Sequence, residues 1–316
     1  MKAKILSNLK YLLLVLMLPL CLTCKQDAKE SLKIKGYPDL KLGFTTQNFL
    51  KAMPLSVANL MELITYASDA GFQFIEIRDD LATLTTEECK ILADLAEKNN
   101  LEVIYEIQRN LLDTGYFEIF NKGMENALQF SDPVILRAMI SKSEFTENPD
   151  KKGWTRDELV RIAAIADSCS MIAESMNAHF LIENSDESFF GDGQTYFGLS
   201  DFFDNTSKVG LQFDMGNPFR KSARVKSDPP QVLQYLSSLE SRWVASHLKT
   251  IIETGGEMQP VLTDSPLTVE ETVAQMGRQN ARYVALELLA VPDKQECFRN
   301  HTASIQYLRD RGILEK

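Results

Sequence analysis

The chain has 316 residues, of which 44% are hydrophobic and 25% charged, a mixture typical of a soluble globular protein. Its 15 glycines and 11 prolines are too few for a collagenous or low-complexity chain. The 34 basic and 44 acidic residues give a formal net charge of −10, and no strongly basic segment interrupts this balance. A phosphate backbone would be repelled by such a field, so nucleic acid is not expected as a partner.

Residues 1–24 have the composition of an export signal. Lys2, Lys4 and Lys10 give a positive start, and residues 12–22 form an apolar run that is too short to span a bilayer comfortably. The run ends at Cys24, and a cysteine at this junction resembles the lipidation site of a bacterial lipoprotein signal. The alternative is ordinary cleavage without a lipid.

Both alternatives predict an exported protein, either free in the periplasm or anchored in the outer membrane of a bacterium. In the anchored form, we expect the protein to contact the membrane only through the lipid on Cys24. Removal of the leader takes away three lysines and no acidic residue, which leaves 31 basic and 44 acidic residues and a net charge of −13. We expect a polar tether over residues 25–37 and a single domain over residues 38–316.

Short apolar segments alternate with amphipathic helical segments through this domain. The helical segments carry start signals: Thr85, Thr155 and Thr268 each stand three residues before a glutamate, the spacing of a capping box. Eight strands are predicted, at residues 42–44, 72–77, 101–107, 134–138, 179–183, 210–213, 243–248 and 283–288.

Alternation of strands and helices predicts parallel strands joined by right-handed crossovers. Eight such units in roughly 270 residues favour a closed (β/α)8 TIM barrel, in the α/β class, over an open sheet. The less favoured fold is a doubly wound sheet, but no glycine-rich phosphate-binding turn follows any of the predicted strands.

Ionisable residues stand at the ends of the predicted strands, where the active sites of barrel enzymes lie. Four of them on the last four strands form a set that suits a divalent cation such as Mn²⁺, Mg²⁺, Co²⁺ or Zn²⁺: Glu183, Asp214, His247 and Glu287. Three converging carboxylates without a cation would repel one another strongly. The alternative is that each residue pairs separately with a loop.

The strand motifs that carry these residues resemble those of the sugar phosphate isomerase/epimerase family, part of the xylose-isomerase-like TIM-barrel superfamily. The segments are Leu181-Ile182-Glu183-Asn184, Phe213-Asp214-Met215-Gly216-Asn217, Ser246-His247-Leu248-Lys249 and Ala285-Leu286-Glu287-Leu288. The segment from Gly71 to Ile77, which contains Glu76, resembles the family's second strand, so the likeness extends from about Lys41 to Leu314.

The resemblance implies one divalent metal ion held by Glu183, Asp214, His247 and Glu287, with Glu183 and Glu287 also acting as acid and base. Lys249 lies on the same face as His247 and is placed to bind a developing oxyanion; the alternative is a lysine that pairs with an acidic neighbour. Further strand-end and loop residues are candidates for substrate binding: Glu76, Glu106, Arg137, Phe189 and Asn217.

Asn217 stands where many relatives carry histidine, so the particular epimerase reaction does not follow from the resemblance. We therefore expect a metal-dependent isomerase or epimerase, or a lyase or dehydratase, acting on a sugar derivative. Because sugar phosphates are largely cytoplasmic, export favours an unphosphorylated sugar. A non-catalytic carbohydrate-binding lipoprotein is the other class of function left open, and the sequence leaves the oligomeric state open as well.

Overall fold

A computed structural model describes residues 30–140, 153–185, 188–220, 227–252 and 256–315. The whole of the predicted leader, including Cys24, and residues 25–29 of the predicted tether lie outside the described residues. The packed unit begins at Ser31, seven residues before the domain start expected from sequence. Within the described part of the chain, every helix is too short or too polar to span a bilayer.

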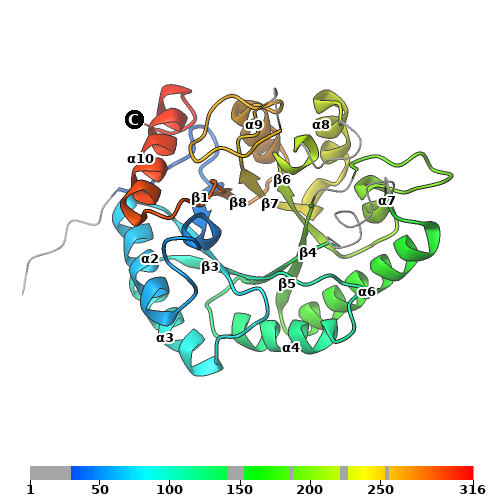
Figure 1. Ribbon diagram of the computed structural model, residues 1–316, viewed down its shortest axis with the longest axis horizontal. Coiled ribbons are helices and arrows are strands. Elements are labelled where there is room, and N and C mark those ends of the chain that lie inside the picture. Colours follow the sequence, from blue (N-terminus) through cyan, green and yellow to red (C-terminus); the bar gives the residue numbers. More distant parts are fainter. Residues whose placement is uncertain (1–29, 141–152, 186–187, 221–226, 253–255, 316) are drawn as a thin grey trace, which may run out of the picture. The chain divides into compact units, whose positions relative to one another are not determined.

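Eight parallel strands form a closed barrel in which each strand pairs with its neighbours in sequence and the last pairs with the first (Figure 1). This confirms the predicted (β/α)8 TIM barrel. The strands are β1 Lys41–Thr45, β2 Phe74–Arg78, β3 Glu102–Ile107, β4 Val134–Met139, β5 Ala178–Glu183, β6 Gly210–Asp214, β7 Trp243–Leu248 and β8 Tyr283–Leu286.

Helices between the strands cover the outside of the barrel. Capping boxes at Thr85, Thr155 and Thr268 begin three of them, as the sequence predicts. The described helices are α2 Val57–Ala70, α3 Thr86–Lys98, α4 Tyr116–Ala127, α6 Arg156–Ser175, α7 Leu199–Asp204, α8 Pro229–Ser238, α9 Val269–Arg278 and α10 Lys294–Asp310, with short 3-10 helices η2 Thr46–Phe49, η3 Asn217–Phe219 and η4 Glu240–Arg242.

Side chains alternate between the inside and the outside of the barrel along each strand, so inward-pointing residues lie two apart. They form an apolar layer and a charged layer inside the barrel. One layer is a buried apolar cluster of Phe74, Ile104, Ile135, Leu181, Ala245, Tyr283 and Ala285. Two residues further along most of these strands, the next inward positions carry charged side chains. The fold therefore places a ring of ionisable groups above an apolar floor, at the carboxyl ends of the strands.

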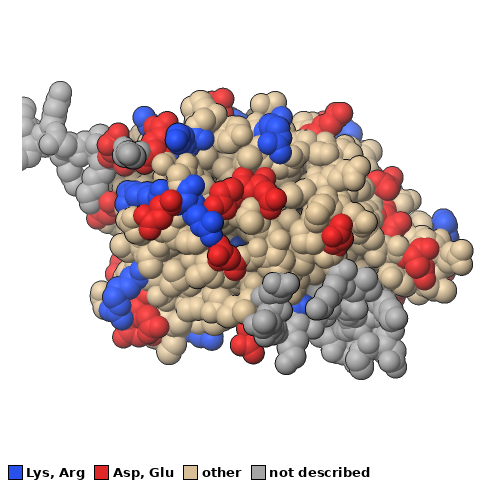
Figure 2. All heavy atoms as spheres, turned by 90° about the horizontal axis from the view of Figure 1, so that it is seen from above, with Lys and Arg blue, Asp and Glu red and all other residues tan. Residues whose placement is uncertain are grey.

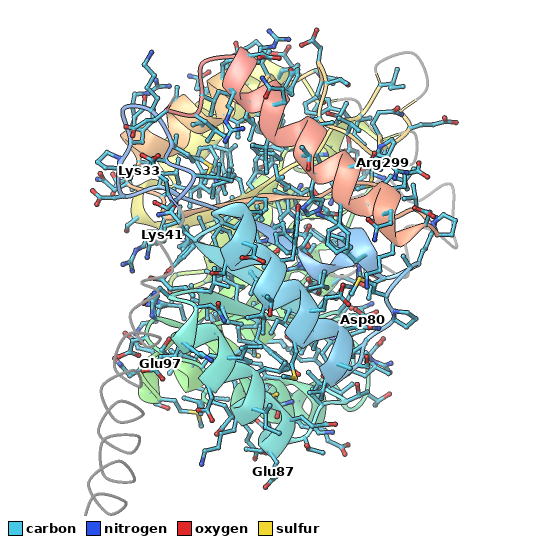
Figure 3. All side chains as sticks on the ribbon, turned by 90° about the vertical axis from the view of Figure 1, so that its left-hand side faces the viewer. Lys33, Lys41, Asp80, Glu87, Glu97 and Arg299 are labelled. Atoms are coloured by element: carbon cyan, nitrogen blue, oxygen red, sulfur yellow. The ribbon has the colours of Figure 1, made fainter. Side chains whose placement is uncertain are left out.

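Both ends of the packed unit lie at the opposite end of the barrel, where the strands begin. Ile34 forms an antiparallel bridge with Leu314, and Lys33 forms one with Lys41. Figure 3 shows Lys33 and Lys41 at this end and Asp80, which follows β2, at the other. The buried Ile34 side chain joins the core, so these residues belong to the barrel.

Acidic and basic side chains lie next to one another on the face seen in Figure 2, with uncharged residues between them. Surface pairs such as Lys294 with Glu62 fit this mixed pattern. By contrast, the ionisable side chains at the carboxyl ends of the strands lie inside the barrel.

Candidate metal centre and active site

Four side chains from the last four strands meet at the carboxyl end of the barrel. Glu183, Asp214, His247 and Glu287 each offer one ligand atom, and these atoms all lie within 4.8 Å of one another. All four residues are buried, with at most 3% of their surface exposed. The set that the sequence predicts as metal ligands is thus brought together in space.

The register of the parallel strands produces this meeting. Asp214 and His247 are direct partners across β6 and β7, and Glu183 is paired with Gln212, two residues before Asp214. Glu287 directly follows β8, and its backbone N–H donates to the carbonyl of Leu248, 3.0 Å away. The four ligand atoms therefore come from neighbouring strands at similar depth.

Asp214 is fixed by the backbone around it. Its Oδ1 accepts hydrogen bonds from the N–H groups of Gly216 and Asn217 at 2.8 and 2.9 Å. The Asn184 side chain accepts from the Asp214 N–H at 2.7 Å and donates to its carbonyl at 3.0 Å. The turn after β6 thus leaves Oδ2 as the oxygen that faces the cluster.

His247 is oriented by a carboxylate on the far side of its ring. Its Nε2 lies 2.6 Å from Oε2 of Glu76, and Gln212 Nε2 donates to Glu76 Oε1 at 2.6 Å. Its Nδ1 faces the cluster, 3.0 Å from Glu183 Oε1 and 2.5 Å from Glu287 Oε2. A proton on Nε2 donated to Glu76 leaves Nδ1 as the ligand atom, the arrangement by which carboxylates orient metal-binding histidines.

Lys249 reaches the cluster from the residue after β7. Its Nζ contacts Asp214 Oδ2, lies 2.7 Å from Glu287 Oε1 and donates to Asn217 Oδ1 at 3.1 Å. A Cβ on Gly216 would come within 2.8 Å of the Lys249 stem, so glycine leaves room for this side chain. Lys249 therefore places a positive charge inside the site. Its contacts are compatible with both roles considered from the sequence, which are binding of a developing oxyanion and pairing with an acidic neighbour.

The charges in the cluster shift one another's pKa values. Burial opposes ionisation of Glu183, but Arg137 and His247 outweigh it and lower the pKa of its carboxyl to about 2. For Asp214, burial prevails over the attraction of Lys249 and raises the pKa. The pKa of His247 is raised because Glu76, Glu287 and Glu183 outweigh the burial of its ring. The site thus concentrates negative charge that cations must balance.

The residues present fit a divalent cation. Hard carboxylate oxygens and an imidazole nitrogen are ligands that such ions accept. Among the described residues, Asp214 Oδ2 and Glu287 Oε2 are buried and accept no hydrogen bond of normal geometry, although cationic groups lie near both. Glu183, Asp214, His247 and Glu287 would hold the ion.

Four of the predicted substrate-binding residues, Glu76, Glu106, Arg137 and Asn217, lie around the cluster and contact other side chains or the backbone. Glu76 contacts His247, and the buried Arg137 pairs with Glu106 and Glu183. Asn217 Nδ2 donates to the Asn184 carbonyl at 2.8 Å. These side chains surround the cluster, but each is engaged by another residue of the chain.

Phe189 is placed away from the cluster. Its ring is 2% exposed and lies 6.0 Å from the ring of Phe213 and 5.6 Å from that of Tyr235. Phe213 alternates with the inward-pointing Gln212 and Asp214, so it points out of the barrel, and Phe189 packs with it. The structure therefore gives Phe189 a place in an aromatic cluster outside the strands.

Sequence reasoning missed two residues after β1. Gln47 Nε2 donates to Glu287 Oε1 at 2.7 Å. Asn48 donates to the Leu286 carbonyl at 2.9 Å and accepts from the Leu288 N–H at 2.8 Å, so it grips the backbone on both sides of Glu287. The polar run Thr45-Thr46-Gln47-Asn48 after an apolar strand was the available signal, but it contains no ionisable group.

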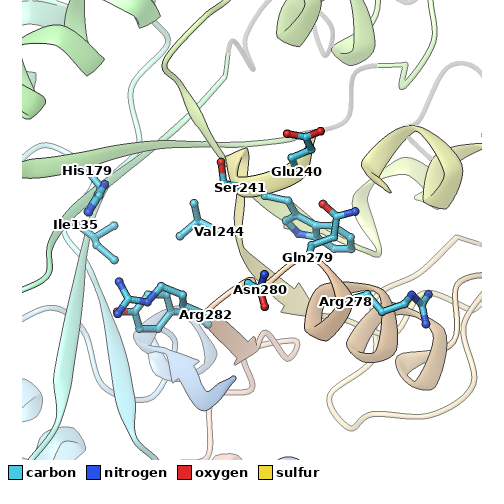
Figure 4. Close-up of a pocket in the computed structure, with 11 residues that line it drawn as sticks. Ile135, His179, Glu240, Ser241, Val244, Arg278, Gln279, Asn280 and Arg282 are labelled. Carbon is cyan, nitrogen blue, oxygen red and sulfur yellow. The ribbon is translucent and has the colours of Figure 1, made fainter. Parts of the chain in front are cut away.

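A separate hollow of about 540 Å³ lies at the strand beginnings, and none of the four ligand residues lines it. Figure 4 shows His179, Val244 and Arg282 around this hollow. It lies at the other end of the barrel, beneath the apolar floor that includes Ile135 and Tyr283. The hollow is therefore distinct from the candidate metal centre.

Comparison with solved structures supports the fold. A sugar phosphate isomerase/epimerase from Parabacteroides distasonis aligns with a TM-score of 0.58 and 16% identity over 87% of this chain and 100% of its own. A D-allulose 3-epimerase from Methylomonas sp., solved in complex with D-allulose, aligns with a TM-score of 0.62 and 11% identity over 89% and 99%. A xylose isomerase-like TIM barrel protein from Mycobacterium smegmatis, in complex with magnesium, gives 0.59 and 13% over 86% and 97%.

At these identities the matches show a shared barrel fold. No protein-family model matches the chain. No curated protein matches it in sequence.

Proposed function

We propose that the protein is an exported, metal-dependent isomerase or epimerase that moves a proton next to the carbonyl of an unphosphorylated keto sugar. The observation that carries this proposal is the buried cluster of Glu183, Asp214, His247 and Glu287 at the carboxyl end of the barrel. Support also comes from the fold, which is shared with an epimerase that binds D-allulose.

The residues of the cluster supply the groups that such a reaction needs. A divalent cation bound there would polarise the carbonyl and a neighbouring hydroxyl, which makes the adjacent carbon-bound proton more acidic. Glu183 and Glu287 approach from β5 and from the end of β8, so one carboxylate removes the proton and the other returns one. Lys249 places an ammonium beside Glu287, where it stabilises negative charge developing on a substrate oxygen.

The second candidate function is a lyase or dehydratase. We retain it because of the residue at position 217. The family resemblance places a histidine at this position in many relatives, whereas here Asn217 accepts a hydrogen bond from Lys249 and donates one to the Asn184 carbonyl. An amide cannot exchange protons as an imidazole does, so proton transfer on this side of the site rests on Lys249 and the glutamates.

Proton exchange with solvent tests the proposal directly. The protein is incubated with D-fructose or D-allulose in D₂O, with and without Mn²⁺, and deuterium at the carbon next to the carbonyl is followed by NMR. We expect metal-dependent exchange and turnover in the wild type. Glu183→Gln and Glu287→Gln should each lower both by about 10²-fold or more, because they keep the shape but remove the base.

Glu240→Gln is the matched control, since Glu240 lies beside the hollow at the strand beginnings. Full turnover in Glu287→Gln at saturating metal would contradict the two-base reaction. Elimination products from a panel of keto sugars and glycosides would assign the site to a lyase. Sugar binding without exchange or turnover across that panel would favour the carbohydrate-binding lipoprotein.

Export and lipidation form the remaining part of the proposal. Their support is the composition of residues 1–24 and the cysteine at position 24. Cys24→Ser should move the protein from the membrane fraction to the soluble fraction. Unchanged fractionation would exclude Cys24 as the anchor, and retention in the cytoplasm would contradict export.

A further inference from the structure

Strands β1–β4 supply none of the four ligands, yet four side chains from their ends form a connected chain between the two glutamates. We infer that this chain, formed by Gln47, Arg78, Glu106 and Arg137 and called the arc below, is a positioning device for Glu287 and Glu183. The inference rests on the proposed function, because it assigns the arc to the acid and base of that site.

The first end of the arc holds Glu287. Gln47 Nε2 donates to Glu287 Oε1 at 2.7 Å, and Gln47 Oε1 accepts from Nη1 of Arg78. A guanidinium has donors only, so Arg78 fixes which end of the amide faces it. The amide NH₂ of Gln47 is thereby directed at Glu287.

The second end of the arc holds Glu183. Arg137 Nη1 pairs with Glu183 Oε2, and its Nη2 lies 2.5 Å from Glu106 Oε2. The Arg137 side chain is 1% exposed, and each of its terminal nitrogens is engaged by a carboxylate. A planar guanidinium that engages one carboxylate through each terminal nitrogen sets the position of both.

Glu106 joins the two ends. Its Oε1 lies 3.8 Å from Arg78 Nε, and Arg78 Nε also pairs with Asp80 Oδ1 at 2.6 Å. The Glu106 side chain is 1% exposed. These contacts assign Glu106 and Arg137 to the support of the site, rather than to direct contact with substrate as expected from sequence.

The two glutamates divide their oxygens in the same way. The inner oxygens, Glu183 Oε1 and Glu287 Oε2, face His247 Nδ1 at 3.0 and 2.5 Å. The outer oxygens, Glu183 Oε2 and Glu287 Oε1, contact the arc, and Glu287 Oε1 also contacts Lys249. Holding both oxygens fixes the plane of each carboxylate, and proton transfer is sensitive to that alignment.

Gln47→Leu tests the first end without changing charge, and the D-allulose assay described above supplies the rate. We expect kcat and deuterium exchange to fall about 10- to 100-fold, with KM and the Mn²⁺ dissociation constant little changed. A rise in KM at unchanged kcat would mean that Gln47 binds substrate, and would overturn the assignment.

Arg137→Met tests the second end but leaves Glu106 and Glu183 facing each other without their cation, which threatens folding. The double variant Arg137→Met/Glu106→Gln removes one charge of each sign. We expect the thermal midpoint to fall in the single variant and to return towards the wild-type value in the double variant. We expect kcat to stay low in both variants. Recovery of kcat together with stability would reduce the arc to a purely structural role. Lys41→Met/Glu102→Gln removes a partly exposed ion pair at the other end of the barrel, with the same change of charge, and is the control.

A metal-centred measurement separates failure of this inference from failure of the proposed function. Bound Mn²⁺ relaxes water protons in proportion to the waters on the ion, whether or not the protein turns over a sugar. A glutamate that loses its partner in the arc is held less tightly and can bind the ion with both oxygens, which displaces water. In Gln47→Leu, Lys249 is the remaining contact of Glu287 Oε1 described above. We therefore expect lower relaxivity in Gln47→Leu and in Arg137→Met/Glu106→Gln than in the wild type and the Lys41 control. Equal relaxivity in all four proteins would overturn the positioning role, while absence of turnover in the wild type alone would overturn only the proposed function.

Discussion

The two inner layers of the barrel are equally buried but opposite in chemistry. They lie two residues apart on the same strands, as in the pairs Phe74 and Glu76, Ile104 and Glu106, Ile135 and Arg137, Leu181 and Glu183, Ala245 and His247, and Ala285 and Glu287. Because side chains on one face of a strand recur every second residue, each of these pairs places one residue in the apolar layer and one in the charged layer.

The two layers differ in how their burial affects the free energy of folding. Burial of the apolar layer stabilises the fold by roughly 25 cal/mol per Å² removed from water. Burial of the charged layer is unfavourable unless each group finds a partner of opposite charge or a cation. Substitutions in the apolar layer should therefore change stability first, and substitutions in the charged layer should change metal binding and activity first.

Asp214→Ala should have the largest effect on metal binding. It removes an oxygen from the centre of the cluster, while the folded barrel is retained. Elemental analysis of wild-type protein purified without chelator should find about one divalent ion per chain, and the variant should lose it. Asp214→Asn should weaken the affinity instead, with activity partly restored by excess Mn²⁺. Stoichiometric metal in the alanine variant would disprove the assignment of the site.

Leu181→Ala, two residues before Glu183, should show the converse behaviour. Removal of this buried side chain should lower the free energy of unfolding by about 2–5 kcal/mol, because a cavity forms in the apolar layer. Chemical denaturation measures this loss, and kcat per folded molecule should be preserved. Val160→Ala is the control, since Val160 is 52% exposed on α6. Loss of kcat comparable to that of Glu183→Gln would show that the two layers are not separable.

Glu76→Gln should have an intermediate effect, because Glu76 acts through His247. Replacement of the carboxylate keeps the shape but weakens the hydrogen bond that orients the imidazole. Affinity for Mn²⁺, measured by calorimetry, should fall roughly 10- to 100-fold. Glu102→Gln, on the neighbouring strand at the other end of the barrel, is the control. An unchanged affinity would mean that Glu76 balances charge without orienting the ligand.

Substitution of His301 should give the smallest effect. His301 is a buried ionisable group that has no charged partner among the residues that the structure describes. It lies on α10 among Phe44, Phe49 and Tyr66, and burial lowers its pKa to about 3. The unfolded chain binds a proton near pH 6.5 and the folded chain does not, so this contribution to stability is present above pH 6.5 and is lost as the pH falls towards 3.

Between pH 7.5 and 5.5 this loss amounts to about 1.4 kcal/mol. Denaturation of the wild type and of His301→Gln at the two pH values measures it, because the other titrating groups contribute equally to both proteins. Equal pH dependence of the two proteins would show that folding does not lower the pKa of His301.

The sequence by itself determined the barrel and the positions of its elements. Period-two and helical apolar patterns depend on local geometry, as do the capping boxes at Thr85, Thr155 and Thr268, and the structure confirms both. Their places at the ends of the predicted strands also indicated that Glu183, Asp214, His247 and Glu287 converge, since a closed barrel brings successive strand ends together.

Only the tertiary structure decided how these groups are connected. Gln47 is 240 residues from Glu287 in the chain, and its amide carries no charge that would mark it in a sequence. Glu106 and Arg137 are visible as strand-end residues, but their pairing with each other and with Glu183 depends on the rotation of long side chains within the closed barrel. Phe189 lies six residues after the end of β5, yet its ring packs outside the barrel against that of Phe213. Local patterns fix which face of a strand a residue occupies, whereas the partner that each side chain selects is set by strand register and by charges that only the closed barrel brings into contact.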